Sequence, residues 1–230
     1  MLAALSKSFL ARSLEVATRA LPSFGRSTLV IAPASEGSLG DQAILQGLQD
    51  GLGRGGESEP IHQLLLDDYR PIGLRSGSSP SVAMSSSPNR ARAALSMAAW
   101  SHHHLLVAGA DVMDGHYGSP GVIRRCEILN QWVANGRRGT VAGFSFNESP
   151  TAEAVDALAS LHPDVRILAR DPVSHERLRR RGVRADLAAD LAFLMSPSIG
   201  SAQHGETIAF LDAQDADGRK VLGVNVHGPY

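Results

Sequence analysis

Short apolar runs alternate with segments of helical spacing along most of the chain. Strand patterns lie at 28–32, 61–66, 104–107, 140–144, 165–169 and 183–188, and helical patterns at 41–52, 91–100, 121–135, 151–161 and 172–181. Continuous apolar strands are typical of a parallel sheet that is buried on both faces, and helices of ten or more residues serve as its crossovers. The pattern therefore predicts an α/β fold, a Rossmann-like parallel sheet with helices on both faces.

The same pattern divides the chain into three parts. Residues 1–26 carry apolar and basic positions at the spacing of an amphipathic helix, which either packs against the domain or touches a membrane peripherally. Residues 27–211 hold the α/β domain, with a Ser/Gly/Pro-rich loop at 75–89. Residues 212–219 are polar and turn-like, and 220–230 show one more buried-strand pattern. We interpret 212–230 as a linker and the first strand of a truncated second domain.

Composition narrows the classes of partner and compartment. The 230 residues contain 22 Lys and Arg against 23 Asp and Glu, so no basic excess is available to neutralise nucleic-acid phosphates. The single cysteine excludes a disulfide framework, and no apolar run of about 18 residues predicts a membrane span. We expect a cytoplasmic protein without a nucleic-acid partner. The arginines at 177 and 179–181 are interpreted as a solvated helix face.

Polar residues follow four of the expected strands. They lie at 37–41, 111–117, 145–147 and 170–171. Because parallel strands place their carboxyl ends at one edge of the sheet, and ligands bind there where the strand order reverses, we expect one binding site built from these segments. The first segment opens a helix with Gly37 and Gly40, whose backbone N–H groups suit an anion. Asp41 in the same corner either caps the helix or accepts a hydrogen bond from a hydroxyl of the ligand.

Four motifs give the chain a resemblance to a known family. They read GSLGDQAI at 37–44, GADVMDG at 109–115, GFSF at 143–146, and RDPVS at 170–174 followed by DLAFL at 190–194. The chain thereby resembles the polysaccharide pyruvyl transferase family over about residues 27–195 and the strand near Val221. One departure is the stretch 108–111, Ala-Gly-Ala-Asp, where family members often carry a run of glycines.

The resemblance implies a fold and a reaction. Family members are similar to two-domain GT-B-like enzymes, of which residues 27–211 would form the N-terminal half. They transfer the enolpyruvyl unit of phosphoenolpyruvate onto two hydroxyls of a sugar, which leaves a cyclic ketal. The implied partners are phosphoenolpyruvate, as donor substrate without a separate cofactor, and a sugar or lipid-linked glycan of a cell-surface or exported polysaccharide. A lipid-linked acceptor would place the enzyme at the inner face of the membrane.

Such chemistry needs an anion cradle at the donor. Arg170 follows a strand directly, and its planar fork matches a phosphate or a carboxylate. Ser174, one turn into the next helix, can donate to the same anion. The alternatives are a structural Arg170–Asp171 pair and a simple helix-start hydroxyl at Ser174. Asp190 either positions Arg170 or caps a turn.

The reaction also needs groups that move protons and bind hydroxyls. His116 lies in a polar loop, where Asp114 can orient it as a proton carrier; the alternative is a surface-loop histidine. Asp111 and Asn147 are predicted to bind substrate, Asn147 through a hydroxyl or the donor carboxylate. Tyr117 can stack on a sugar ring.

The remaining histidine candidates are the run at 102–104 and His227. The run at 102–104 looks like a metal site, but neighbouring side chains on a strand alternate between faces, so we interpret it as a helix-to-strand junction and expect no metal. His227, after the last strand pattern, is a weaker candidate proton carrier.

Two other functions compete with pyruvyl transfer. One is a GT-B-like glycosyltransferase that uses a nucleotide sugar, and the other is a non-catalytic remnant.

Overall fold

The computed structural model of the chain describes residues 27–34, 37–54, 61–66, 69–75, 80–84, 87–196 and 202–221. The chain forms two compact units, Met1–Met195 and Ser196–Tyr230. The amphipathic helix expected over 1–26 and the strand expected beyond residue 221 lie outside the described residues, as does His227.

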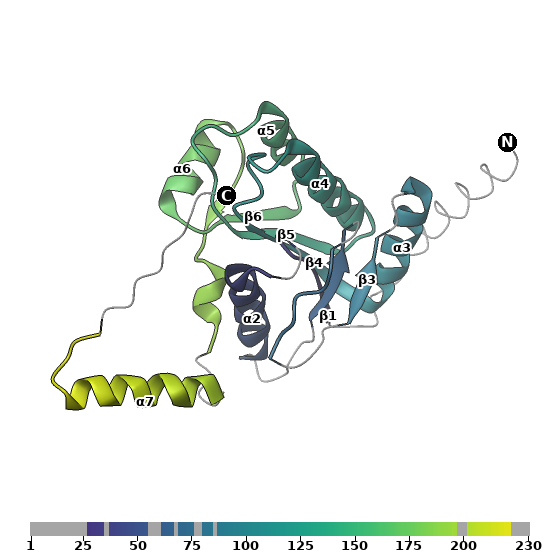
Figure 1. Cartoon of the computed structure of the whole chain (residues 1–230). Coiled ribbons are helices and arrows are strands. Elements are labelled where there is room, and N and C mark those ends of the chain that lie inside the picture. The colour runs from purple at the N-terminus through teal and green to yellow at the C-terminus, as the bar shows by residue number, and fades with distance from the viewer. Residues whose placement is uncertain are drawn as a thin grey trace, which may run out of the picture. The chain divides into compact units, whose positions relative to one another are not determined.

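The first unit is built on a parallel sheet, which confirms the predicted α/β fold. The described strands pair in the order β3-β2-β1-β4-β5-β6-β7, every pair parallel (Figure 1). Their bounds are β1 Ser27–Ile31, β2 Ile61–Leu65, β3 Ser81–Ala83, β4 His102–Ala110, β5 Arg138–Phe144, β6 Val165–Ala169 and β7 Asp186–Leu187. From β1 the chain first moves outward through β2 and β3, then returns to β4, so the strand order reverses between β1 and β4.

Helices cover both faces of this sheet. They are α2 Leu39–Gly53, α3 Pro88–Ser101, α4 Ser119–Ala134, α5 Ala152–Ala159, α6 Pro172–Arg180 and the short 3₁₀ helix η1 Leu191–Leu194. Consecutive β1 residues enter different cores: Leu29 and Ile31 pack with side chains of α3, α4 and α5, whereas Val30 packs with side chains of α2. This alternation explains the continuous apolar run of β1, because neither of its faces meets water.

Three expectations about local structure are wrong in part. The loop expected over 75–89 contains β3, a short and largely exposed edge strand that pairs with β2. The strand expected over 183–188 shrinks to the two residues of β7. The turn-like interpretation of 212–219 holds for the turn at 217–218 but fails for 212–216. The second unit contains helix α7, Ala202–Ala216, whose sequence holds no proline and ends before Gly218.

Backbone hydrogen bonds extend the ladder past the strand ends and align the loops that follow. The N–H of Ser145 donates to the carbonyl of Ala110 at 2.7 Å, and that of Arg170 donates to Phe144 at 3.0 Å. The starts of the loops after β4, β5 and β6 are therefore held side by side. Within the described residues no helix combines the length and the apolar character that a membrane span requires.

Candidate functional site

The start of α2 forms the first corner of the site. Ser38 is the N-cap, and its Oγ accepts a hydrogen bond from the N–H of Asp41 at 3.2 Å. Gly37 has a φ of 117°, a region that favours glycine. A Cβ at Gly40 would meet no atom closer than Ser38 Oγ at 3.8 Å, so packing does not require glycine there. Its absence of a side chain leaves the helix N–H groups open to a ligand.

Asp41 lies close enough to Asp111 to be affected by its charge, at the point where the strand order reverses. The helix is capped by Ser38, so the interpretation of Asp41 as the cap is wrong. Burial and, more weakly, the charge of Asp111 raise the pKa of Asp41, against the lowering effect of the hydrogen bond with Ser38. The two carboxylates, one from the loop end after β1 and one after β4, thus sense each other's charge.

The loop after β4 carries an exposed aromatic pair beside Asp111. The hydroxyl of Tyr117 donates to Asp111 Oδ2 at 3.1 Å, and the Tyr117 side chain is 64% exposed. The ring of His116 meets the Tyr117 ring edge-on, with centroids 5.4 Å apart. Both rings are exposed to solvent, so a substrate can reach them.

Asp114 is buried beneath this loop, and it shapes the backbone. Only 4% exposed, its carboxylate accepts the N–H of His116 at 2.8 Å and the N–H of Asn147 at 3.3 Å. Its own carbonyl accepts the N–H of Thr151 at 3.0 Å. Asp114 therefore ties the loops after β4 and β5 together. It orients His116 through the main chain, and no hydrogen bond joins it to the His116 ring.

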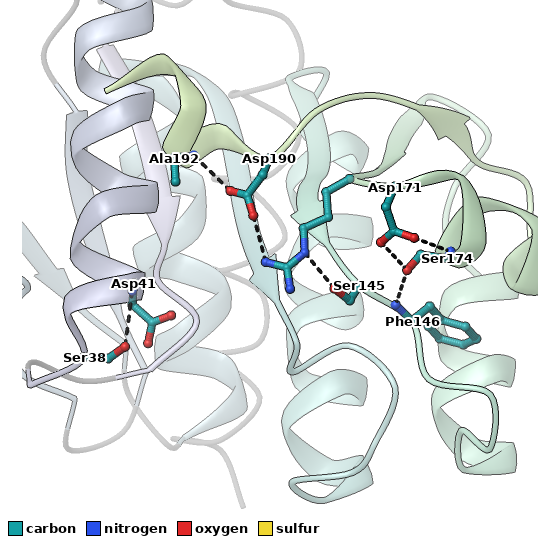
Figure 2. A network of polar contacts seen from close by, with 9 residues as sticks. Ser38, Asp41, Ser145, Phe146, Asp171, Ser174, Asp190 and Ala192 are labelled. Atoms are coloured by element: carbon teal, nitrogen blue, oxygen red, sulfur yellow. Dashed lines mark hydrogen bonds and ion pairs between the residues drawn. The ribbon is translucent and has the colours of Figure 1, made fainter. Parts of the chain in front are cut away.

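Arg170 extends from the end of β6 and is held at two points. Its Nε donates to Ser145 Oγ at 2.7 Å, and its Nη1 donates to Asp190 Oδ2 at 2.9 Å (Figure 2). The side chain is 26% exposed, and within the described residues Nη2 makes no hydrogen bond. The ion-pair partner of Arg170 is thus Asp190, whereas the sequence alternative paired it with Asp171. The Nη2 group of a fixed guanidinium stays available to an anion.

Asp171 and Ser174 brace the start of α6. Asp171 is the N-cap and accepts the N–H of Ser174 at 2.8 Å. The Ser174 hydroxyl donates to Asp171 Oδ2 at 2.6 Å and accepts the N–H of Phe146 at 2.8 Å (Figure 2). Burial alone would raise the pKa of Asp171, but hydrogen bonds from Ser174 and Val173 and the charge of Arg170 lower it overall. Because Ser174 is only 2% exposed, its position favours the structural alternative over contact with a ligand.

Asp190 performs both of its predicted roles. One carboxylate oxygen holds Arg170, and the other accepts the N–H of Ala192 at 2.9 Å, which caps η1. Gly47, against which η1 packs, was not predicted as part of the site: a Cβ there would collide with the carbonyl of Leu191. The available signal was a pair of glycines four residues apart on α2, at 47 and 51. This contact links α2 to the residue that positions Arg170.

Arg125 of α4 was also missed. It is 3% exposed, and its guanidinium donates to the carbonyls of Pro33 at 2.7 Å and Gly121 at 3.1 Å. It thereby holds the backbone just after β1 against the first turn of α4. An arginine inside a helical pattern gives no sign in the sequence that it lies in the core.

The predicted residues thus fall into two groups at one edge of the sheet. Arg170, Ser145 and Asp190 form a cationic group, while Asp41 and Asp111 form an acidic group at the reversal point (Figure 2 shows Ser38 and Asp41 on α2, and the network around Asp190 and Ser145). Asn147 is exposed, and its Oδ1 accepts the N–H of Ser149 at 3.1 Å. The arrangement offers an anion contact and carboxylate acceptors for hydroxyls.

Neither a known protein-family model nor a curated protein sequence matches this chain.

Proposed function

We propose that this chain contributes to a polysaccharide pyruvyl transferase, which transfers pyruvate from phosphoenolpyruvate as a ketal onto a sugar of a cell-surface or exported polysaccharide. The observation that carries the proposal is the Arg170 guanidinium, which Ser145 and Asp190 fix through Nε and Nη1 while Nη2 makes no hydrogen bond with the described residues. It stands at the strand-end edge that also holds the open N-terminus of α2 and the Asp41–Asp111 pair. A substrate with phosphate and carboxylate groups beside a polyhydroxylated acceptor suits this pairing.

The donor binds at the cationic group. Phosphoenolpyruvate carries a phosphate and a carboxylate, and either can lie in two-point contact with a guanidinium fork. The N–H groups near Gly40 supply a second anion contact without a further charge. Asp190 keeps the guanidinium of Arg170 oriented before the donor binds, which lowers the entropic cost of binding.

The reaction proceeds by protonation and two additions of oxygen. His116, exposed in its loop, protonates the methylene carbon of the donor and leaves a cationic centre at the adjacent carbon. One sugar hydroxyl adds to that carbon and gives its proton to a base, for which Asp41 is placed. A second hydroxyl then attacks the same carbon, the bond to phosphate breaks, the departing inorganic phosphate takes the hydroxyl proton, and the ketal closes. The raised pKa of Asp41 brings its basicity closer to what proton transfer needs.

The acceptor lies at the acidic group in this proposal. Asp111 accepts a sugar hydroxyl, and the exposed face of Tyr117 stacks on the ring. The acceptor is a sugar or a lipid-linked glycan, and the second half of the cleft comes from a C-terminal domain in a GT-B-like arrangement. We place the reaction in the cytoplasm, at the inner face of the membrane when the acceptor is lipid-linked.

Calorimetric titration tests the donor assignment. Phosphoenolpyruvate should release heat on binding to the chain, and a uridine-diphosphate sugar in a parallel titration should not. Arg170→Ala should raise the Kd for phosphoenolpyruvate about tenfold or more, since it removes a charge-assisted contact. The matched control is Arg179→Ala, because Arg179 is an exposed arginine of α6 that pairs with Glu176.

Three outcomes would contradict the proposal. Heat from the nucleotide sugar alone would favour the glycosyltransferase alternative. If neither ligand released heat, the result would favour a non-catalytic remnant or a donor site in another domain. Equal affinity of Arg170→Ala and the parent for phosphoenolpyruvate would show that the donor binds elsewhere.

A further inference from the structure

A groove of about 410 Å³ lies between α3 and α4, in the helix layer and apart from the residues of the strand-end site. Its polar lining comes from Asn89 and Arg92 of α3 and from Arg124, Glu127 and Gln131 of α4. Apolar side chains complete it, Met84 and Ile128 among them. Ligand sites in proteins commonly begin at about 300 Å³, so the groove can hold a small metabolite.

The charge of the groove is positive and partly uncompensated. Two arginines and one glutamate line it, which leaves one positive charge in excess. Arg92 makes no hydrogen bond or ion pair with any described residue, so its guanidinium is available. Glu127 is exposed, which lets water screen its repulsion of an anionic ligand.

The start of α3 adds donors at the same place. Pro88 and Asn89 of its first turn line the groove, the side chain of the N-cap Ser87 makes no capping hydrogen bond, and the first turn contains no acidic residue. The positive end of the helix is therefore not neutralised by its own sequence. Gln131 also lines the groove, and its Nε2 is a buried donor with no hydrogen-bond partner.

We propose that this groove binds a small phosphate monoester, at a second site separate from the donor site around Arg170. Two guanidinium groups, a helix N-terminus and an amide are donors that match the oxygens of a phosphate. The apolar lining and the volume leave room for a body about the size of a monosaccharide. The site is independent of the proposed pyruvyl transfer, since none of its residues takes part in it.

The test uses glucose 1-phosphate and inorganic phosphate as probes, at constant ionic strength, on the chain carrying Arg170→Ala. That background removes the main anion contact of the strand-end site, so a failure of the proposed function does not affect the result. Amide NMR shifts of Asn89 and Arg90 should move on titration with either probe. Adding Arg92→Ala should weaken binding about tenfold, and adding Gln131→Leu should weaken it less. Adding Arg179→Ala is the charge-matched control and should leave the affinity unchanged.

Two results would overturn the proposal. One is that the variant with Arg92→Ala keeps the native fold in its amide spectrum and binds the probes with unchanged affinity. The other needs no groove variant: if neither probe moves the amides of Asn89 and Arg90 in the Arg170→Ala chain, the groove is not a phosphate site. Binding of glucose 1-phosphate but not of inorganic phosphate supports the monoester class.

Discussion

The histidines at the two ends of the parallel strands differ in what they contact. The amino-terminal ends of the strands form the amino-terminal edge of the sheet, and their carboxyl ends form the carboxyl edge. At the amino-terminal edge, His102 Nε2 and His62 Nδ1 share a hydrogen bond of 2.8 Å, and His104 Nε2 bonds to Thr140 Oγ1 at 2.9 Å. At the carboxyl edge, the rings of His116 and Tyr117 meet solvent. The difference teaches that residue type alone does not mark a candidate site; exposure of the side chain at the ends of the strands also matters.

The helix-to-strand interpretation of the histidine run is confirmed by this comparison. Helix α3 ends at Ser101, and β4 begins at His102. The Nδ1 of His102 lies 2.9 Å from the carbonyl of Ala98, so the imidazole also closes the last turn of the helix. His62, His102 and His104 therefore bond to the protein, whereas the ring of His116 is exposed to solvent.

The largest expected effect is on turnover at the carboxyl edge. His116→Ala in the complete enzyme should lower the transfer rate by about 10²–10⁴-fold, the range of a general acid, while phosphoenolpyruvate affinity stays unchanged. Rate assays and calorimetry on the same preparation check the two halves of this prediction. His162→Ala serves as the control, since His162 is an exposed histidine far along the chain. A variant that keeps its rate would remove His116 from the mechanism.

The next effect concerns acid stability at the amino-terminal edge. Burial, with the nearby charges of His103 and Arg138, lowers the pKa of His104 from 6.5 to about 4. The unfolded chain therefore binds more protons below pH 6.5. The free energy of unfolding should fall by about 3 kcal/mol as the pH drops from 6.5 to 4, and the His104 contribution should level off below that.

Denaturant unfolding at several pH values measures this slope. His104→Gln removes the titration, so the variant should lose that part of the pH dependence. His116→Gln is the control at the opposite edge. An unchanged slope in His104→Gln would show that the acid sensitivity comes from other groups, such as His62 and His102, whose pKa values burial also lowers.

A third change acts on the link between α2 and Arg170. Gly47→Ala places a methyl group against the carbonyl of Leu191, which should cost about 2 kcal/mol of unfolding free energy and displace Asp190. Weaker phosphoenolpyruvate binding should accompany the loss. Gly53→Ala in the same helix is the matched control, because its Cβ meets nothing within 4 Å and alanine favours the helix. Equal stability of the two variants would contradict the tight contact.

The smallest expected effect separates charge from geometry at the donor site. Arg170→Lys keeps the positive charge but cannot donate to Ser145, Asp190 and a ligand from one rigid plane. We expect an increase of about tenfold in the Kd for phosphoenolpyruvate with little change in stability, measured by calorimetry and thermal unfolding. Full affinity in the lysine variant would mean that charge alone suffices.

Much of the fold could be predicted from local sequence patterns, and the predictions that failed share a cause. The strand over Val165–Ala169 was predicted with the observed bounds, because its apolar run and flanking turns depend on neighbouring residues only. Strand β3 was missed because three exposed residues in a Ser/Gly/Pro-rich stretch become a strand only by pairing with β2. The site behaved similarly: strand-end positions were predictable, and Asp190 was a candidate to position Arg170. The choice of Asp190 over Asp171 as its ion-pair partner depends on a contact between residues twenty apart in the chain.

The sequence by itself determined the class of fold, the positions of the strand ends and the chemistry placed on them. Hydrophobic period and turn residues are local, so they can be read without coordinates. Only the tertiary structure decided which groups are already bonded within the protein. The Ser174 hydroxyl accepts the N–H of Phe146 inside the fold, Arg170 pairs with Asp190 rather than with Asp171, and the charge of Asp111 acts on Asp41. These facts depend on distances between segments far apart in the chain, which the order of residues does not contain.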